Sequence, residues 1–306
     1  PAAASAFEPG QFFRLQNFER SAPTVTVYGQ ATRLGMEGLA MTGAWTNSQT
    51  GELGMIVLEM GGSSDLCASL TPGEAIVLMG PTGTPTEIVA QQNVVLVGGG
   101  LGNAVLFSIG AALRAAGCKV LYIAGYKKTT DRFRPEAIEA AADRVVWCSE
   151  QTPGFAPRRE HDYCFDGNVV QAIDAAITRE PSAKAFDDLP FDIQDADRFI
   201  VIGSDRMMAA VAHACSHAWA STLKTNVTLI ASINSPMQCM MKAICAQCIQ
   251  RHVDPVSGES KLVFSCANQD QPMDSVDFDC LAERLGQNSL QEKQTAHWVE
   301  KSLNKG

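Results

Sequence analysis

The sequence has no excess of basic residues and no long apolar run, and each absence excludes a class of protein. Among its 306 residues, 24 are Lys or Arg and 33 are Asp or Glu, which gives a formal net charge of −9. Nucleic-acid-binding chains normally show the opposite balance or a basic stripe, and the sequence has neither. Every run of about 18 residues is broken by a charge, Gly or Pro, so we expect no membrane-spanning helix. The N-terminal residues lack the basic segment and apolar core of a signal peptide, and we therefore expect a cytoplasmic protein.

Residues suited to hydrolytic chemistry are also scarce. The chain has five histidines, and His213 and His217 stand four residues apart on an expected helix. No third metal ligand stands beside them, so we interpret both as ordinary surface or core residues. No Ser-His-Asp grouping and no pair of carboxylates in a credible pocket emerges, which argues against a hydrolase.

Cysteine, in contrast, is abundant. The chain has ten cysteines, and structural disulfides are rare in a cytosolic protein, so their spacing points to metal or redox chemistry. Four of them, Cys239, Cys245, Cys248 and Cys266, follow the pattern C-x5-C-x2-C-x17-C. Plant-type [2Fe–2S] loops use C-x4-C-x2-C with a distant fourth cysteine, so this spacing favours an iron–sulfur cluster. A structural zinc bound by the same thiolates, or cysteines without any ligand, are the alternatives.

The chain divides by pattern into a β-rich first part and an alternating second part. Up to about residue 90, short β-type runs are separated by turns, which predicts a small antiparallel barrel with strands at 11–15, 24–28, 55–59 and 75–79. From residue 93, apolar strands alternate with helices, which predicts a doubly wound α/β domain of about five parallel strands. The expected strands are 94–97, 119–124, 144–148, 198–202 and 226–231, and the expected helices are 104–116, 135–142, 169–178 and 207–219. Residues 179–196 interrupt this alternation and are expected to form a surface excursion, and two terminal helices are expected at 278–285 and 289–303.

A glycine-rich turn connects the first α/β strand to the first helix. Glycines at this point let the backbone approach a pyrophosphate and point a helix N-terminus at its charge, so the turn predicts a dinucleotide site. A turn needed only for packing is the alternative, because the spacing is not the usual G-x-G-x-x-G. The turn contains Gly98, Gly99, Gly100, Leu101, Gly102 and Asn103.

The end of the second α/β strand carries cations where an NAD-binding chain tends to place an acid. Lys127 and Lys128 come directly after this strand, and Arg132 follows. Cations suit the 2′-phosphate of NADP, whereas an acid would hold the ribose hydroxyls of NAD. The pattern leans toward NADP, with two solvated lysines as the alternative reading, so the choice between NAD and NADP stays open.

Several short motifs follow one another in the order found in one known family. They read P-G-Q-F at 9–12, G-G-S-S-D-L at 61–66, P-G-E at 72–74, M-G-P-T-G at 79–83, G-G-G-L-G at 98–102 and I-G-S-D-R-M-M at 202–208. With the order barrel, α/β domain and cysteine loop, the chain resembles the ferredoxin–NADP reductase superfamily. It is most similar there to the electron-transfer subunits of dihydroorotate dehydrogenase and the small subunits of NADH-dependent ferredoxin:NADP oxidoreductases.

The resemblance implies where the cofactors would bind. It places FAD at the P-G-Q-F motif and the strand that follows it, at a later strand that contains Thr42, and at the G-G-S-S-D-L loop. It places the nicotinamide at the I-G-S-D-R-M-M motif. The implied FAD residues are Gln11, Phe12, Arg14, Thr42, Gly61, Gly62, Ser63 and Ser64, and the implied nicotinamide residues are Gly203, Ser204, Asp205 and Met207.

Two motifs depart from the family pattern. The flavin motif Arg-Pro-aromatic-Ser/Thr should fall at 39–42, where only Thr42 matches, and Arg14 is a candidate substitute for its arginine. The nicotinamide loop carries Ser204 and Asp205 where the family usually has Cys-Gly-Pro chemistry. A barrel strand usually precedes the P-G-Q-F motif, so we expect this chain to be a piece of a longer polypeptide.

The resemblance implies an NAD(P)H-linked oxidoreductase module. Hydride from NAD(P)H would reduce FAD, and single electrons would pass to a [2Fe–2S] cluster and then to a partner subunit or domain, such as another flavoprotein or iron–sulfur protein. A non-redox nucleotide-sensing module with a structural zinc, or a simple flavin reductase, are the alternatives. The domains would be a FAD-binding barrel at 1–90, an NAD(P)-binding α/β domain at 91–232, a [2Fe–2S] loop at 233–275 and a helical tail at 276–306.

Overall fold

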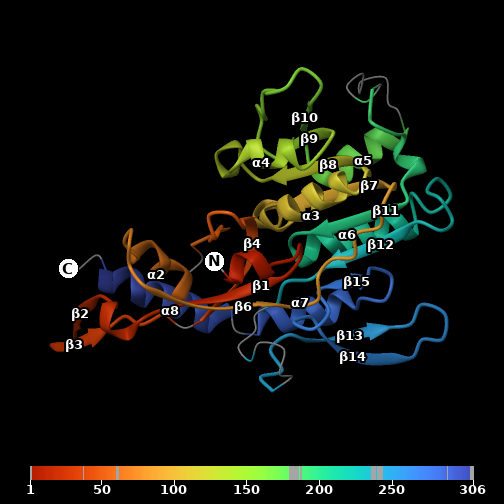
Figure 1. The fold of residues 1–306 in the computed structure, drawn as a ribbon. Helices are drawn as coiled ribbons and strands as arrows, with labels where there is room; N and C mark the ends of the chain where they lie inside the picture. Colours follow the sequence, from red (N-terminus) through yellow and green to blue (C-terminus); the bar gives the residue numbers. More distant parts are fainter. Residues whose placement is uncertain are drawn as a thin grey trace.

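Two sheets and a C-terminal hairpin form the frame of the molecule (Figure 1). The computed structural model describes residues 2–36, 38–59, 62–178, 186, 188–235, 239, 244–287 and 289–303. The barrel sheet, the larger α/β sheet and the hairpin lie next to one another. Within the described residues, no helix is both long enough and apolar enough to cross a membrane.

The barrel domain is built on a four-stranded antiparallel sheet of order β5-β4-β1-β6, with a separate hairpin of β2 and β3. Side chains alternate between the faces of each strand, so Leu15 of β1 and Leu39 and Met41 of β4 pack into the barrel core. The strands are β1 (Phe12–Asn17), β2 (Thr24–Val27), β3 (Gln30–Arg33), β4 (Leu39–Asn47), β5 (Glu52–Met55) and β6 (Ile76–Thr82), and the helices are α1 (Ala2–Ala6) and α2 (Ser63–Leu66).

The barrel core is completed by the far end of the chain. Helix α8 (Ser289–Leu303) lies beside α2 and the β2–β3 hairpin (Figure 1). Its Val299 is only 3% exposed and packs with Leu15 and Leu66. The helix has the predicted bounds, but it is a part of the barrel core rather than a separate tail.

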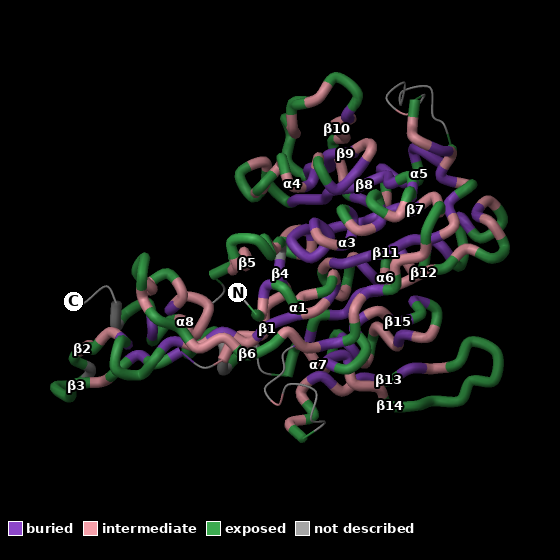
Figure 2. Tube along the Cα trace, viewed as in Figure 1, coloured by how far each residue is buried: buried purple, intermediate pink, exposed green. Residues whose placement is uncertain are grey.

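The α/β domain has a seven-stranded sheet of order β10-β9-β8-β7-β11-β12-β15. All strand pairs are parallel except β12 with β15. Helices α3 and α4 pack on one face, and α5, α6 and α7 on the other, so the central strands are buried on both sides (Figure 2). The strands are β7 (Asn93–Gly99), β8 (Lys119–Tyr126), β9 (Arg144–Ser149), β10 (Tyr163–Asp166), β11 (Arg198–Ile202), β12 (Thr228–Ser232) and β15 (Asp270–Pro272). The helices are α3 (Asn103–Ala115), α4 (Pro135–Ala140), α5 (Val169–Thr178), α6 (Asp205–Ser216) and α7 (Phe278–Gly286).

The sheet contains two strands more than the five predicted. Strand β10 is short and only partly buried, so its sequence gives no strong apolar run. Strand β15 lies within 233–275, the segment assigned to the cysteine loop, yet it pairs with β12 at the sheet edge. The hairpin of β13 (Ile249–Val253) and β14 (Ser260–Phe264) also lies in that segment. Of the predicted excursion at 179–196, residues 179–185 and 187 lie outside the described residues.

The strand predicted at 55–59 is wrong, and β4 was not predicted. Strand β5 ends at Met55, just after Gly54, whose missing Cβ leaves space for the Trp45 ring of β4. The next residue, Ile56, packs against the α/β core instead of continuing the strand.

Candidate functional site

The glycine turn between β7 and α3 is shaped by close backbone contacts. Gly100 has a φ of +53°, a conformation that L side chains rarely adopt. A Cβ on Gly102 would overlap the carbonyl oxygen of Ile202 at the end of β11. No side chain caps the N-terminus of the 13-residue helix α3, and the Asn103 N–H donates to Gly100 within the preceding 3-10 turn. The helix dipole at this end favours an anionic group.

Asn103 holds this turn from inside. Its side chain is fully buried, and its Nδ2 donates to the carbonyl oxygens of Gly100 and Gly125, at 2.9 and 3.5 Å. Gly98 leaves the space that the Asn103 side chain fills. The residue therefore links the turn to the end of β8, and any contribution of Asn103 to nucleotide binding would come from holding the loop.

The second candidate loop meets the first at the carboxyl ends of β7 and β11. The Met207 thioether lies against both Gly99 and Gly203, and a Cβ on Gly203 would come 2.5 Å from the Met207 Cε. Ser204 caps α6 by accepting a hydrogen bond from the Met207 N–H at 3.2 Å. Chain order reverses between these two neighbouring strands, which is where ligands of open α/β sheets bind.

The loop after β8 is cationic and exposed at its start. Lys127 and Lys128 are exposed, and the N–H of Lys128 donates to Asp131 at 3.2 Å. The Arg132 guanidinium lies over the rings of Trp147 and Phe155, with its carbon 5.1 and 4.5 Å from their centroids. The loop thus presents two mobile ammonium groups and one guanidinium fixed by aromatic rings.

Arg14 and Thr42 share one face of the strand pair β1–β4. Phe12 is paired with Thr42 and Arg14 with Ala40, so all four side chains project from the same face, away from the barrel core. The Arg14 guanidinium lies where a Cβ on Gly38 would be. Arg14 therefore reaches the backbone just before residue 39, the position where the family motif has its arginine.

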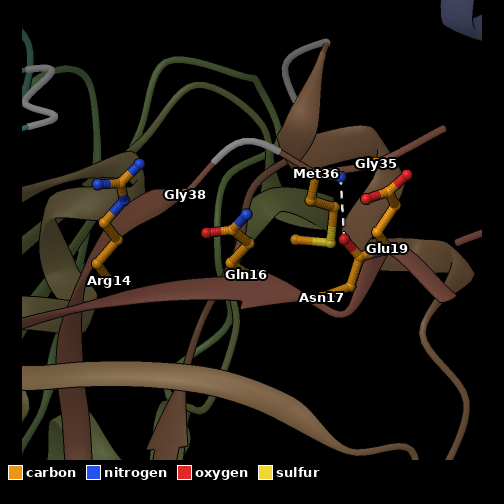
Figure 3. Close-up of a pocket in the computed structure, with 7 residues that line it drawn as sticks. All are labelled: Arg14, Gln16, Asn17, Glu19, Gly35, Met36 and Gly38. Carbon is orange, nitrogen blue, oxygen red and sulfur yellow. Dashed lines mark hydrogen bonds between the residues drawn. The ribbon is translucent and has the colours of Figure 1, made fainter. Parts of the chain in front are cut away.

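A hollow of about 460 Å³ opens beside Arg14 (Figure 3). Arg14 and Gln16 rise from β1 toward Gly38, and Asn17 accepts a hydrogen bond from the N–H of Met36 at 3.0 Å. This volume is in the range of small-molecule sites. Gln16, Gly35 and Gly38 were not predicted, because only strand pairing brings them to one place. The lining residues are Arg14, Gln16, Asn17, Glu19, Gly35, Met36 and Gly38.

The small-residue loop leads into α2. Gly62 has a φ of +56° and stands at the start of α2, while Ser63 and Ser64 are partly buried. A Cβ on Gly62 would come 3.8 Å from the Thr295 methyl of α8. Gly61 lies outside the described residues. Gln11 does not face the hollow, since its side-chain amide donates to the carbonyl oxygen of Gly83 at 3.1 Å.

The structure brings two of the four predicted cysteine ligands together. Cys248 and Cys266 are each 1% exposed, and their Sγ atoms are 3.2 Å apart. Two thiolates on one tetrahedral metal lie about 3.8 Å apart, given metal–sulfur bonds of about 2.3 Å, so this pair would have to open by about 0.6 Å to share a metal. The Sγ of Cys239 accepts a hydrogen bond from the N–H of Ile244 at 3.4 Å, and Cys245 is half-buried.

The four-cysteine site is not assembled in the part of the chain that the structure describes. No group of three or more His, Cys, Asp or Glu side chains there is placed to hold a metal ion. Residues 236–238, which precede Cys239, and residues 240–243, which join it to the other ligands, lie outside the described residues.

Comparisons with known proteins agree on the fold. No protein-family model matches the sequence. The chain is 28% identical over 293 residues to an uncharacterised protein of Rickettsia prowazekii, covering 96% of this chain and 30% of that protein. It is 26% identical over 298 residues to a Thermotoga maritima homologue of the electron-transfer subunit of dihydroorotate dehydrogenase B (NAD(+)), covering 96% and 86%.

A solved structure of the NADH-dependent reduced ferredoxin–NADP oxidoreductase superposes with a TM-score of 0.73 at 24% identity, covering 98% of this chain and 90% of that one. The chain has the ferredoxin–NADP reductase fold. Its sequence is similar to dihydroorotate dehydrogenase electron-transfer subunits, and the named relatives are oxidoreductase components. The chain spans about 30% of the Rickettsia protein.

Within this ferredoxin–NADP reductase fold, three of the remaining cysteines are packing residues. Burial raises the pKa of the Cys215 thiol to about 12 and that of Cys164 to about 11, and it raises the pKa of Cys148 further. A thiol with a raised pKa stays protonated at neutral pH, and the protonated form is neither a nucleophile nor a metal ligand. These three thiols are therefore suited to packing rather than to metal or redox chemistry.

Proposed function

We propose that this chain is an electron-transfer module that accepts hydride from NAD(P)H on FAD and passes electrons to a [2Fe–2S] cluster and on to a partner subunit or domain. The observation that carries the proposal is the meeting of two loops, Gly98–Asn103 and Gly203–Met207, at the switch point of an α/β sheet attached to a barrel. Dinucleotides bind at such points.

The nucleotide would be held mainly by backbone groups. The uncapped N-terminus of α3 would receive the pyrophosphate, and the glycines would let it approach. Met207 would contact the nicotinamide end, since its thioether lies across Gly99 and Gly203. Lys127 and Lys128 would face the adenosine ribose, and they support NADP over NAD through their charge alone.

The flavin would lie on the outer face of β1–β4. Arg14 lines the hollow beside this face and would offset the charge of the flavin phosphates in place of the missing motif arginine. Thr42, Gly62, Ser63 and Ser64 would supply neutral hydrogen bonds. Flavin is the required intermediate carrier because a nicotinamide releases two electrons together and a [2Fe–2S] cluster takes one.

Cys239, Cys245, Cys248 and Cys266 would hold the cluster, with Cys248 and Cys266 on its buried side. No acid–base side chain is needed for this chemistry, so the protein supplies positions and surroundings. We retain the domain bounds 1–90, 91–232, 233–275 and 276–306 as a proposal, with β15 and α8 as segments that cross them. The electrons would leave to another flavoprotein or iron–sulfur subunit, and a cytoplasmic location stays a prediction.

A visible spectrum with metal analysis tests the proposal. Purified protein is expected to show flavin bands and a broad reddish cluster absorbance, with about two irons per chain. Addition of NADH or NADPH without oxygen should bleach the flavin first. A colourless protein with about one zinc would instead establish the nucleotide-sensing alternative, and flavin without iron would establish a simple flavin reductase.

A further inference from the structure

The buried cysteine pair is seated directly on the barrel. Cys248 and Cys266 form one apolar cluster with Phe12 of β1, together with the partly buried Ala40 and Phe264. Phe12 is 1% exposed and is the largest barrel side chain in this cluster. The sequence motif assigned Phe12 to the flavin, and the structure adds the cysteine pair as its neighbour.

The face that carries Phe12 also carries the two flavin candidates. The register pairs Phe12 with Thr42 and Ala40 with Arg14, so these four side chains alternate along one surface of β1 and β4. The Phe12 ring therefore shares one face with the proposed flavin residues and packs against the cysteine pair. Among the described residues of the cluster, the other barrel side chain is Ala40, which is smaller and only partly buried.

Contacts with Gly83 and Thr84 hold the Phe12 ring and the Cys266 loop in place. Gly83 has a φ of +90°, and a Cβ there would come 2.7 Å from the Phe12 Cε1, so this glycine gives the ring its space. Next to it, the Thr84 hydroxyl donates to the carbonyl oxygen of Ala267 at 2.5 Å and ties the Cys266 loop to the barrel. Ring and loop are thus held at one junction.

We propose that Phe12 is a positioning residue of the metal centre, which keeps water from the Cys248 and Cys266 sulfurs and thereby sets the reduction potential of the centre. This inference rests on the proposed function. Reduction makes a thiolate-bound centre more negative, and apolar surroundings disfavour the added charge. Exclusion of water by Phe12 therefore lowers the reduction potential of the centre. The other two candidate ligands, Cys239 and Cys245, are only partly buried.

The test compares Phe12→Leu with Phe13→Leu in the full chain. Phe13 is the matched control, because it is the same residue type on the same strand, is 0% exposed and points to the other face, where it stacks on Phe7. Both variants remove the same volume. Only Phe12→Leu is expected to raise the midpoint potential of the cluster measured by redox titration.

A second readout needs no metal. In iron-free protein, the alkylation of Cys248 and Cys266 by iodoacetamide, measured by peptide mass spectrometry, should be severalfold faster in Phe12→Leu than in Phe13→Leu. Thr84→Val, an exposed change that removes the tie to Ala267, should shift both readouts in the same direction by less. If Phe12→Leu fails to fold, Thr84→Val still tests the inference by the same two measurements.

The outcomes distinguish failure of this inference from failure of the proposed function. If the wild type binds no iron, the proposed function fails, while the alkylation rates still report whether Phe12 shields the pair. Equal potentials and equal alkylation rates in Phe12→Leu and Phe13→Leu would overturn the inference although cluster and flavin are present.

Discussion

The two sheets of this molecule are completed in different ways. The α/β sheet takes six of its seven strands from residues 93–232, and it is covered by helices of that segment together with α7 from the C-terminal region. The barrel sheet depends on segments more than 150 residues away, since Val299 enters its core and Cys248 and Cys266 pack on its outer face. The difference indicates that the α/β part is built mostly from one continuous segment, whereas the barrel is shaped by the C-terminal region.

Loss of a cysteine ligand is the largest expected effect, because it removes a whole cofactor. Cys245→Ser should abolish cluster iron, while NAD(P)H still bleaches the flavin, since hydride transfer from the nicotinamide to the flavin would not use this residue. Iron analysis and anaerobic spectra measure both. Cys280→Ser is the control and should keep its iron. Loss of flavin reduction in Cys245→Ser would show that the order of carriers is wrong.

Truncation of the Val299 side chain of α8 tests the dependence of the barrel on distant residues. Val299→Ala should lower the free energy of unfolding of the barrel by about 1.5–3 kcal/mol, the gain from burying a valine side chain. Denaturation followed by flavin fluorescence measures the loss. Val256→Ala, at a site 95% exposed, is the matched control and should change little. A nucleotide affinity that falls in parallel would contradict the independence of the α/β domain.

Substitutions of two glycines in the β7–α3 turn test whether the α/β domain is held by its own contacts. Gly102→Ala meets the backbone oxygen of Ile202, which cannot move away, and should weaken nucleotide binding by about 1–3 kcal/mol. Gly99→Ala meets mainly the flexible end of Met207 and should cost less. Calorimetric titration with NADH and NADPH measures these effects. Equal losses would mean that the turn is not held against β11.

The smallest effect is expected at β15, where the α/β sheet does use a distant segment. Burial raises the pKa of Asp270, and the Thr86 and Ser232 hydroxyls and the Arg198 guanidinium offset this only in part. The folded state then holds the proton more firmly, so stability falls as pH rises from about 4, the ordinary pKa, through the raised value. Asp270→Asn should be more stable than the parent at neutral pH and equal to it in acid. Urea unfolding against pH measures this, and a parent with flat pH dependence would contradict it.

The α/β half was predictable because its signals are local. A strand buried on both faces reads as a solid apolar run, and β7, β8, β9, β11 and β12 were all found this way. The turn at 98–103 follows such a strand directly. Strand β10 was missed because it is short and half-buried, and β15 because its pairing with β12 spans almost 40 residues of intervening chain.

The barrel site was only partly predictable because its members meet through pairing between strands. Arg14 was a candidate from the motif, but its position over Gly38 depends on the register of β1 and β4. Gln16 and Gly35 carried no motif at all. The nearness of Cys248 to Cys266 follows from the β13–β14 hairpin, which the cysteine spacing did not reveal.

By itself, the sequence determined the residue types and the local turns: an α/β core, a glycine turn suited to a phosphate, and four thiols at cluster-like spacing. Only the tertiary structure decided that α8 completes the barrel and that Phe12 of β1 packs against the buried cysteine pair. The physical reason is that apolar burial has no direction along the chain, so a half-buried strand or an amphipathic helix fits many partners until packing selects one.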